Sequence, residues 1–395
     1  MGNALGLRTE ALSKEMHLLL AFLAEDPNPK GLPVLQTELF RDLDWEIFIQ
    51  LAQHHRVYPY LYRQLKTMNE EWVPAWVIQK FYSLYVKNTF QMLHLSGEME
   101  HVGRLFAEHD IQCLFLKGPV IAQDLYGDIS LRTSCDLDLI LPLEDLSKAE
   151  AILLQQGYIK DDYIRTVLND WKWRHHHIVF FHSGKGIKVE LHWRLNPSPA
   201  KDPAFADLWS HRRTSSLTKQ PIYYLGQEDL FLFLVSHGAR HGWSRVRWLL
   251  DIRQLLLQGL NAPKLTELLR KHHYYYIGGQ ALELASGLLS APIDPQLQPM
   301  QNAAQSRRLA QDAIFYLERM VNLHSPPIPE EVDSYHKRHQ FRLLTVSRKF
   351  LFVLSFLFPY PEDAETLPLP RNLHFLYVPL RPFLWAWRKT IGGQG

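Results

Sequence analysis

Apolar residues recur at helical spacing from about Leu7 to His109. The segments that carry this pattern are ALSKEMHLLLAFLAED, DWEIFIQLAQHHRVYPYLYRQL and AWVIQKFYSLYVKNTFQMLHLSGEMEHVGRLFAEHD. Their apolar positions return every three or four residues, and they contain few helix breakers. The pattern therefore predicts a helical N-terminal region over residues 1–110.

The spacing of apolar residues changes where this region ends. IQCLFLKG is a short apolar run that stops at Lys117 and Gly118, as expected of a buried strand. PVIAQDLYG predicts a helix with Pro119 in its first turn and Gly127 past its end. TSCDLDLILP then predicts a second strand and LEDLSKAEAILLQQG a second helix. We expect an α/β core over residues 111–225.

The later part of this core predicts a β-hairpin. HHIVFFHS and GIKVELHWRL alternate between apolar and polar residues around a two-residue turn at 184–185. This turn places Val179 opposite Glu190 and His177 opposite His192, and Glu190 and His192 share a face in any register. The polar face then carries His177, Lys188, Glu190 and His192, and the apolar face carries Ile178, Phe180, Ile187, Val189, Leu191 and Trp193.

From Gln227 onward the apolar spacing is helical again, interrupted by proline-containing loops near residues 292–299 and 326–329. This predicts a C-terminal helical region over residues 226–395. The expected fold class is α+β, with a small mixed-sheet α/β core flanked by two helical regions. A chain of 395 residues with 46% hydrophobic residues is long and apolar enough for two or three such domains.

Composition and charge restrict the function classes. A formal net charge of +2 gives no large basic surface, which argues against a binder of long nucleic acids. The two cysteines, Cys113 and Cys135, are too few for a disulfide framework, so we expect a reducing compartment, the cytoplasm. No secretion signal or lipid anchor is recognisable, and FLFVLSFLFPYP is about half the ~20 residues needed to cross a bilayer.

Two aspartates open the second predicted strand of the core. Asp136 and Asp138 stand two residues apart, so they point to the same face and repel each other unless a cation lies between them. Glu190 adds a third carboxylate on the polar face of the hairpin. Carboxylates of this kind suit Mg²⁺, and two such ions about 4 Å apart can promote an in-line displacement at phosphorus. The alternative is that the aspartates cap a strand while Glu190 and His192 lie on a solvated face.

Lys117 and Gly118 lie at the junction between the first strand and helix of the core. The glycine allows a ligand to approach the backbone, the helix N-terminus offers free N–H groups, and the lysine adds a positive charge. This corner is suited to hold phosphate, although an isolated Lys-Gly is more often a plain turn. Here it precedes the strand of Asp136 and Asp138 by one helix, so both features belong to successive elements.

Taken together, these motifs resemble a known family. LFLKGPVIAQDLYGDISLRTSCDLDLILPLEDLSKAEAILLQQGY, KVELHWRL and EDLFLFLVSHGARHGWSRVRWLLDI resemble the uncharacterised nucleotidyltransferase family of the DNA polymerase β-like nucleotidyltransferase superfamily. The resemblance implies that Asp136, Asp138 and Glu190 bind catalytic Mg²⁺. It also implies that Lys117 and Gly118 form the turn that binds the nucleotide phosphates.

The chain departs from the superfamily at this turn. Pro119 follows Gly118 where the superfamily has a serine, so the contact of that hydroxyl must come from elsewhere, such as Lys117 or Arg132. Arg132, four residues before Asp136, has a planar guanidinium that can clamp a phosphate oxygen. The alternative for Arg132 is an ordinary surface-loop arginine.

Several histidines are secondary candidates for the site. His192 follows Glu190 on the same strand face, and His237, Arg240 and His241 share a helix face that can border the ligand cleft. For these last three residues we favour an interhelical polar cluster. The run WKWRHHHIVFFH raises the question of zinc through His175 with His177, or His176 with His182, but no cysteine is near and no ligand spacing fits. A Ser-His-Asp site is not favoured either, because the G-x-S-x-G pattern is missing.

The C-terminal LHFLYVPLRPFLWAWRKTIGG mixes aromatic and basic residues, a composition found at membrane interfaces. Pro379 and Pro382 interrupt a long amphipathic helix, so we favour packing against the helical region over contact with a membrane surface.

These observations predict a Mg²⁺-dependent nucleotidyltransferase, with two Mg²⁺ ions and an NTP as substrate. It would transfer an NMP to a small-molecule or protein acceptor and release pyrophosphate. The rival hypothesis is a non-catalytic scaffold or regulator that keeps this fold, at a membrane surface through its C-terminus.

Overall fold

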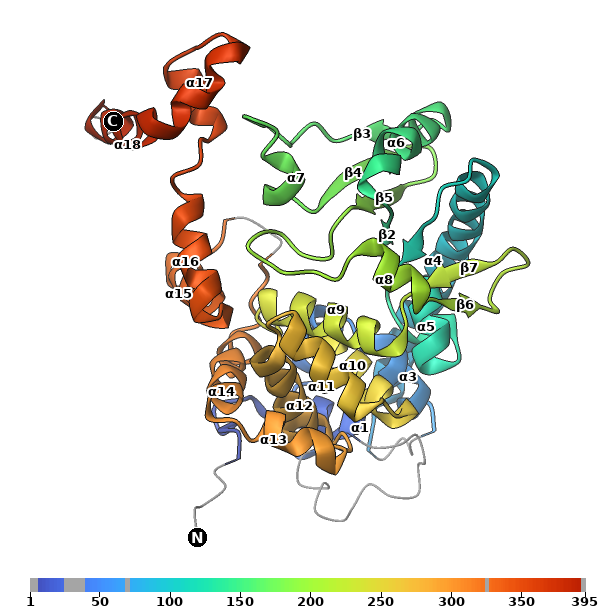
Figure 1. Cartoon of the computed structure of the whole chain (residues 1–395). Coiled ribbons are helices and arrows are strands. Elements are labelled where there is room, and N and C mark those ends of the chain that lie inside the picture. The colour runs from blue at the N-terminus through green and yellow to red at the C-terminus, as the bar shows by residue number, and fades with distance from the viewer. Residues whose placement is uncertain (1–5, 25–39, 68–71, 324–326, 392–395) are drawn as a thin grey trace.

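The computed structural model describes residues 6–24, 40–67, 72–323 and 327–391. A mixed sheet occupies one part of the molecule, helices pack beside it, and the last helices form an arm on one side (Figure 1). The helices are α1 (Lys14–Ala24), α2 (Trp45–His54), α3 (Tyr58–Leu65), α4 (Ala75–Glu108), α5 (Pro119–Tyr126), α6 (Leu146–Gln155), α7 (Trp171–Arg174), α8 (Phe205–Ser210), α9 (Gln227–Arg240), α10 (Val246–Gln258), α11 (Ala262–Lys271), α12 (Tyr275–Leu289), α13 (Gln298–Gln301), α14 (Ala304–Glu318), α15 (Glu330–Leu343), α16 (Val346–Ser355), α17 (Pro361–Thr366) and α18 (Tyr377–Ile391).

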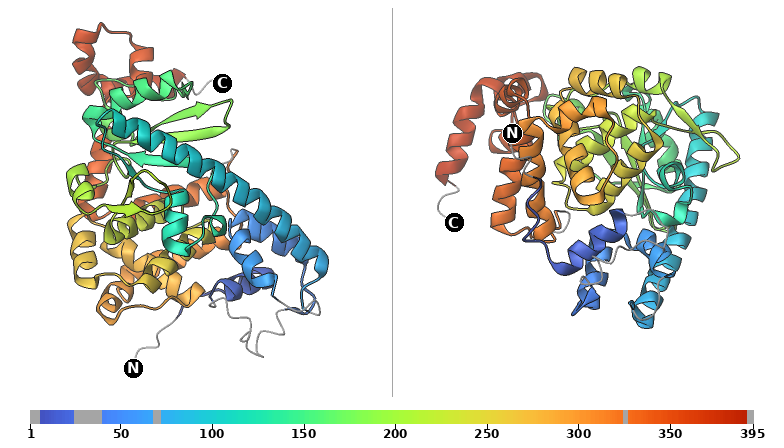
Figure 2. Two further views of the ribbon diagram at one scale, coloured as in Figure 1. Left: turned by 90° about the vertical axis from the view of Figure 1, so that its right-hand side faces the viewer. Right: turned by 90° about the horizontal axis from the view of Figure 1, so that it is seen from below.

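The N-terminal region is helical, as predicted, and α4 runs from the N-terminal helices to the sheet (Figure 2). The predicted helical segment at 44–65 forms two helices rather than one. Asp44 caps α2 by accepting a hydrogen bond from the N–H of Ile47. Arg56, with φ of +59°, and Pro59 in the first turn of α3 separate the two helices.

The strands of the described residues form one seven-stranded mixed sheet in the order β3-β4-β5-β2-β1-β7-β6. Their bounds are β1 (Leu114–Phe115), β2 (Asp136–Ile140), β3 (Ile159–Lys160), β4 (His177–His182), β5 (Ile187–His192), β6 (Arg213–Ser215) and β7 (Ile222–Tyr224). The central strand β2 pairs parallel with β5 and antiparallel with β1. This arrangement confirms the predicted α+β fold class.

The hairpin has the predicted register, with Val179 opposite Glu190 and His177 opposite His192. Its turn is longer than predicted, because it spans residues 183–186, and the N–H groups of Lys185 and Gly186 both donate to the carbonyl of His182. The register is unchanged because the longer loop is centred on the same two residues. The apolar face is buried as expected, for Phe180, Ile187, Val189 and Leu191 are each 0% exposed.

One hydrophobic core joins the N-terminal helices, the sheet and α9 to α14. Its buried members extend from Leu12 to Leu317 along the chain. The boundaries near residues 110 and 225 follow changes in secondary structure within this continuous core, and the division into three domains stays a prediction. The helices α15, α17 and α18 contribute to smaller clusters, one of them around Tyr377, Leu384 and Val167.

The C-terminal segment packs only in part. Tyr377 and Leu384 are buried, whereas Phe383, Trp385 and Trp387 are 73%, 54% and 62% exposed. The favoured packing of this segment against the helical region is therefore wrong for these three side chains, and contact with a membrane surface stays a prediction. Among the described residues, no helix has both the length and the apolar character needed to cross a membrane.

Candidate functional site

The candidate site lies where β2 and β5 run side by side. Their parallel register pairs Asp138 with Glu190 and Asp136 with Lys188. Because alternate residues of a strand share a face, the acidic side chains of both strands point to the same side of the sheet. On the opposite side Leu137, Leu139, Val189 and Leu191 are fully buried and fix both strands in the core.

Asp138 is completely enclosed and has the character of a ligand-binding carboxylate. It is 0% exposed, and neither carboxylate oxygen has a hydrogen-bond partner of acceptable geometry. Buried polar atoms are nearly always satisfied, so two unsatisfied oxygens on one carboxylate indicate a missing partner. The alternative, in which the aspartates cap a strand while Glu190 and His192 lie on a solvated face, does not describe His192, which is 4% exposed.

Two cationic groups face Asp138. The ammonium of Lys117 lies 3.2 Å from its Oδ1, and Nε2 of His192 lies 3.4 Å from the same oxygen. Burial and the nearby Glu190 favour the neutral acid, but the charges of Lys117 and His192 outweigh them and lower the pKa of Asp138. The carboxylate is therefore held in its ionised form, which is the form that binds a cation.

Glu190 is the second enclosed carboxylate. Its Oε2 lies 3.5 Å from Nε2 of His192 and 3.7 Å from Nε2 of His177. Burial again favours the neutral acid, but His192, His177 and Lys117 lower the pKa of Glu190. The two carboxylates in turn raise the pKa of the buried His192. Asp138, Glu190 and His192 thus form a tight group whose ligand atoms lie within 4.8 Å of one another.

Asp136 is on the same face but does not join this group. Its Oδ2 lies 3.2 Å from the ammonium of Lys188, which also lies 2.7 Å from Oε1 of Glu190. The hydroxyl of Ser134 lies within hydrogen-bond distance of its carbonyl oxygen. Lys188 therefore bridges Asp136 and Glu190 and supplies the positive charge that these two anions need.

Gly118 forms the predicted corner between β1 and α5. Its φ of +91° lies in the region that favours glycine, and it is the N-cap residue of α5. The N–H of Leu116, two residues earlier, donates to the carbonyl of Asp138 at 2.8 Å, which fixes the corner beside the acidic strand. Lys117 reaches from this corner to Asp138, so the structure brings the predicted phosphate turn and the predicted metal ligand together.

Arg132 has a different environment from the one that a phosphate clamp requires. It is 1% exposed, so the surface-loop alternative is wrong. Its Nε and Nη2 donate to the carboxylate of Asp251 at 3.0 Å, and Nη1 is the buried guanidinium atom without a partner. Its part in nucleotide binding stays a prediction, and Nη1 is the atom with which it would act.

His237 of α9 and His241, which follows this helix, lie in an interhelical cluster as favoured, whereas Arg240, the third residue expected there, contacts His176. The rings of His237 and His241 lie 4.6 Å apart, and both contact the ring of Trp248 on α10, at 5.3 Å and 5.6 Å. Burial and the charge of Lys117 lower the pKa of His237. His237 is thus packed near the candidate site as a neutral ring.

The structure adds residues to the site that the sequence analysis did not assign to it. His177 is the first residue of β4 and His176 precedes it, their nearest ring nitrogens are 3.1 Å apart, and with His192 they form a second group of possible ligands. Neither histidine pair considered for zinc matches this group. The guanidinium of Arg240 lies 3.2 Å from Nε2 of His176. Its positive charge disfavours binding of a metal cation at this histidine group. The hairpin register, which pairs His177 with His192, could have indicated that His177 belongs to this group. His176 is brought to the group by the tertiary fold.

The group of Asp138, Glu190 and His192 fits a divalent cation. Two ionised carboxylates converge, and the oxygens of one of them are buried without hydrogen bonds. Carboxylate oxygens suit Mg²⁺ or Mn²⁺, while an imidazole nitrogen suits Mn²⁺ and later transition metals better than Mg²⁺. The three residues can hold one cation beside the Lys117 corner once His192 has lost its proton, because a histidine binds a metal only as the neutral imidazole.

Comparison with known proteins identifies the family. A family model described as an uncharacterised nucleotidyltransferase matches residues 41–290. This range contains α2 to α12 and every strand of the sheet. No curated protein and no solved structure matches the chain. The family supports nucleotidyl transfer as the general function and an NTP as the substrate. The chain belongs to this uncharacterised nucleotidyltransferase family.

Proposed function

We propose that the protein is a divalent-cation-dependent nucleotidyltransferase that moves an NMP from an NTP to a small-molecule or protein acceptor. The observation that carries this proposal is the pairing of Asp138 with Glu190 across β2 and β5, with both oxygens of Asp138 buried and lacking hydrogen bonds. A structural carboxylate in such a position would be satisfied by the protein itself. The family supplies the general reaction, and the site supplies the residues.

Each residue of the site has a role in this proposal. Asp138 and Glu190, with His192 beside them, would hold a cation, which would supply positive charge to the phosphates and to the leaving pyrophosphate. Lys117, whose ammonium lies beside Asp138, would bind the phosphates. Glu190 accepts the proton of the attacking oxygen. The acceptor oxygen bonds to the α-phosphorus, the bond from that phosphorus to the β-phosphate oxygen breaks, and pyrophosphate leaves.

The number of cations depends on Lys188. Its ammonium already bridges Asp136 and Glu190, at 3.2 Å and 2.7 Å, and these carboxylates raise its pKa despite its burial. The arrangement therefore supports one cation at Asp138, with the Lys188 ammonium as the second positive charge. The second Mg²⁺ expected from the sequence would require Lys188 to leave Asp136.

Incubation of the protein with NTPs labelled at the α-phosphate, Mg²⁺ or Mn²⁺, and a cell extract tests the proposal. We expect a labelled product and an equal amount of pyrophosphate from the wild type. The Asp138→Asn variant is the test, and Asp162→Asn, on the exposed loop after β3, is the matched control. Equal labelling by wild type and Asp138→Asn would refute the role of Asp138. Binding of Mg²⁺-NTP without any product would favour the rival scaffold function.

A further inference from the structure

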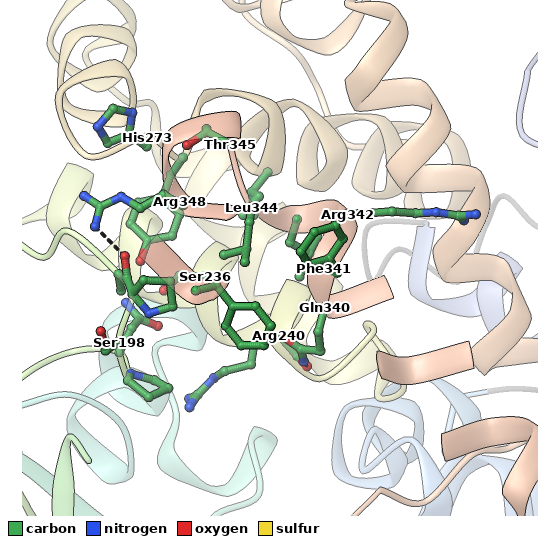
Figure 3. A pocket seen from close by; sticks show the side chains of 18 of the residues that line it. Ser198, Ser236, Arg240, His273, Gln340, Phe341, Arg342, Leu344, Thr345 and Arg348 are labelled. Atoms are coloured by element: carbon green, nitrogen blue, oxygen red, sulfur yellow. Dashed lines mark hydrogen bonds between the residues drawn. The ribbon is translucent and has the colours of Figure 1, made fainter. Parts of the chain in front are cut away.

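A large pocket adjoins the candidate site. Its volume is about 800 Å³, within the range of small-molecule sites, and it lies among α9, the loop after β5, α12, α15 and α16 (Figure 3). Its walls are largely apolar and include Pro199, Ile277, Phe341, Leu344, Phe352 and Phe356. A pocket with such walls excludes water from the body of a ligand and favours an apolar one.

The charged residues that line the pocket are all basic. Of its described lining residues, none is an aspartate or glutamate. The charge of Arg342 is neutralised by its ion pair with Asp312, at 2.9 Å. Its side chain also points away from the pocket in Figure 3. Arg240 and Arg348 differ, because within the described residues neither forms an ion pair with a carboxylate, and the enclosed Nε of Arg240 has no hydrogen-bond partner.

The carboxylates whose charge reaches these two arginines, Asp202 for both and Glu190 for Arg240, form no ion pair with them among the described residues. Asp202 influences both of them through its charge, but its oxygens accept hydrogen bonds from the backbone and side-chain nitrogens of Asn196, at 2.9 Å and 3.0 Å. Burial also raises the pKa of Asp202. The pocket thus presents the guanidinium groups of Arg240 and Arg348, together with that of the more exposed Arg338, without a paired carboxylate among the described residues, within a mostly apolar wall.

Arg240 connects this pocket to the carboxylate site. It lines the pocket, and its Nη1 lies 3.2 Å from Nε2 of His176. The ring of His176 lies 5.5 Å from the ring of His192, whose Nε2 lies 3.4 Å from Asp138. Burial and the positive charge of Arg240 lower the pKa of His176, so this imidazole is neutral and can accept the bond from Arg240. The side chains of His176 and His192 therefore connect a molecule held at Arg240 with the predicted cation.

We propose that this pocket holds the acceptor of the transferred nucleotide, and that the acceptor is an amphiphile with an apolar body and an anionic end bound by Arg240. The inference rests on the proposed function and specifies its acceptor class. The apolar body lies along Leu344 and Phe352, and the anionic end faces His176 and the cation site.

The end at Arg240 is the end that reacts. One of its oxygens bonds to the α-phosphorus of the NTP, the bond from that phosphorus to the β-phosphate oxygen breaks, and pyrophosphate leaves. Any proton on the attacking oxygen passes to Glu190. Arg240 offsets the negative charge of the anion as it approaches the phosphates, which would otherwise repel it.

Binding of a fluorescent probe pair tests the pocket without any reaction. Anilinonaphthalene sulfonate is an apolar aromatic molecule with an anionic group, and phenylnaphthylamine has the same rings without it. We expect Arg240→Gln to weaken binding of the sulfonate by at least about tenfold, because a hydrogen bond to a charged group is lost, and to leave binding of phenylnaphthylamine unchanged. Leu344 lies in the middle of the pocket in Figure 3. The larger side chain of the Leu344→Trp variant should fill this space and weaken binding of both probes.

Lys349→Gln is the matched control for charge. Lys349 follows Arg348 on α16, is not among the residues that line the pocket, and lies over the ring of Phe341 at 5.1 Å. Its removal should change binding of the sulfonate by less than about twofold, as expected for a partly exposed charge that does not line the pocket. Unchanged binding of both probes in Arg240→Gln and Leu344→Trp would overturn the assignment of this pocket.

Different results would refute the proposed reaction and the proposed acceptor pocket. Mg²⁺-ATP binding, measured by calorimetry, should be the same in Leu344→Trp and wild type, because this residue does not touch the cation site. In the labelling experiment we expect the product in the fraction that extracts into organic solvent. Label found only in water-soluble or protein fractions would overturn the acceptor class. Probe binding as expected, with no transfer to any fraction, would instead refute the proposed reaction and leave a binding pocket for amphiphilic anions.

Discussion

Asp138 and Asp251 are two fully buried aspartates in opposite situations. Asp251, on α10, accepts hydrogen bonds from Nε and Nη2 of Arg132 and from the hydroxyl of Tyr126, which lies 2.7 Å from its Oδ1. Asp138, on β2, faces Lys117 and His192 at 3.2 Å and 3.4 Å, but no hydrogen bond of acceptable geometry reaches either oxygen. Both side chains are 0% exposed.

The difference separates a structural charge from a functional one. The fold closes around Asp251 and satisfies it, and this links α5, the loop before β2 and α10. Around Asp138 the fold supplies compensating charge without hydrogen bonds, which keeps the carboxylate ionised and leaves its oxygens available to a ligand. Burial alone therefore does not indicate a ligand-binding carboxylate, and it is burial together with unsatisfied oxygens that supports the role proposed for Asp138.

The largest effect expected is on stability, from Asp251→Asn. This change leaves the charge of Arg132 buried without a counterion, and breaking a buried pair in this way costs about 3 to 5 kcal/mol. Denaturant unfolding measures it. Glu108→Gln is the control, because the exposed Arg104–Glu108 pair, 2.8 Å apart, belongs to a class worth less than about 0.5 kcal/mol. Equal losses of unfolding free energy in Asp251→Asn and Glu108→Gln would refute the structural role of Asp251.

The next effect is on turnover, from Asp138→Asn. Loss of groups behind a metal ligand costs about 10- to 100-fold, so loss of the ligand itself should lower kcat by more than about 100-fold. We expect its stability loss to be smaller than that of Asp251→Asn, because His192 keeps Glu190 as a counterion and the change removes the repulsion between Asp138 and Glu190. If Asp138→Asn keeps its activity but unfolds as readily as Asp251→Asn, Asp138 has a structural role and not the proposed functional one.

A smaller effect is expected from Mg²⁺ or Mn²⁺ on thermal stability. At tenfold excess over the Kd, a cation that binds only the folded state adds about 1.4 kcal/mol, or about 2 °C in Tm for a chain of this size. Differential scanning fluorimetry should find this shift in the wild type and in Asp251→Glu, if that variant folds, but not in Asp138→Asn. A shift of equal size in Asp138→Asn would place the cation elsewhere.

The smallest effect expected comes from Tyr126→Phe. It removes one of the hydrogen bonds to Asp251 and leaves the ion pair with Arg132, so it should cost about 1 kcal/mol of unfolding free energy. Turnover of this variant should remain within about twofold of wild type. A large loss of turnover without a loss of stability would instead connect the Arg132–Asp251 pair to nucleotide binding and support the predicted phosphate role of Arg132.

The sequence determined most of the local elements that build the candidate site. Strand alternation placed Asp136 and Asp138 on one face, and the hairpin pattern paired His177 with His192 correctly. The positions of Gly118 and Gly127 bounded α5, because positive φ angles of +91° and +69° are allowed mainly to glycine. These features depend on neighbours in the chain, so a single sequence contains them.

The tertiary structure decided which of these residues meet. The parallel pairing of β2 with β5, about fifty residues apart in the sequence, joins Asp138 to Glu190 and leaves Asp136 with Lys188. The partner of Arg132 is 119 residues away, and Arg240 lies 64 residues from His176. Contacts over such separations depend on how helices and strands pack in one core, and apolar periodicity does not encode a specific partner. The sequence thus determined the ligands, and the fold decided their environment.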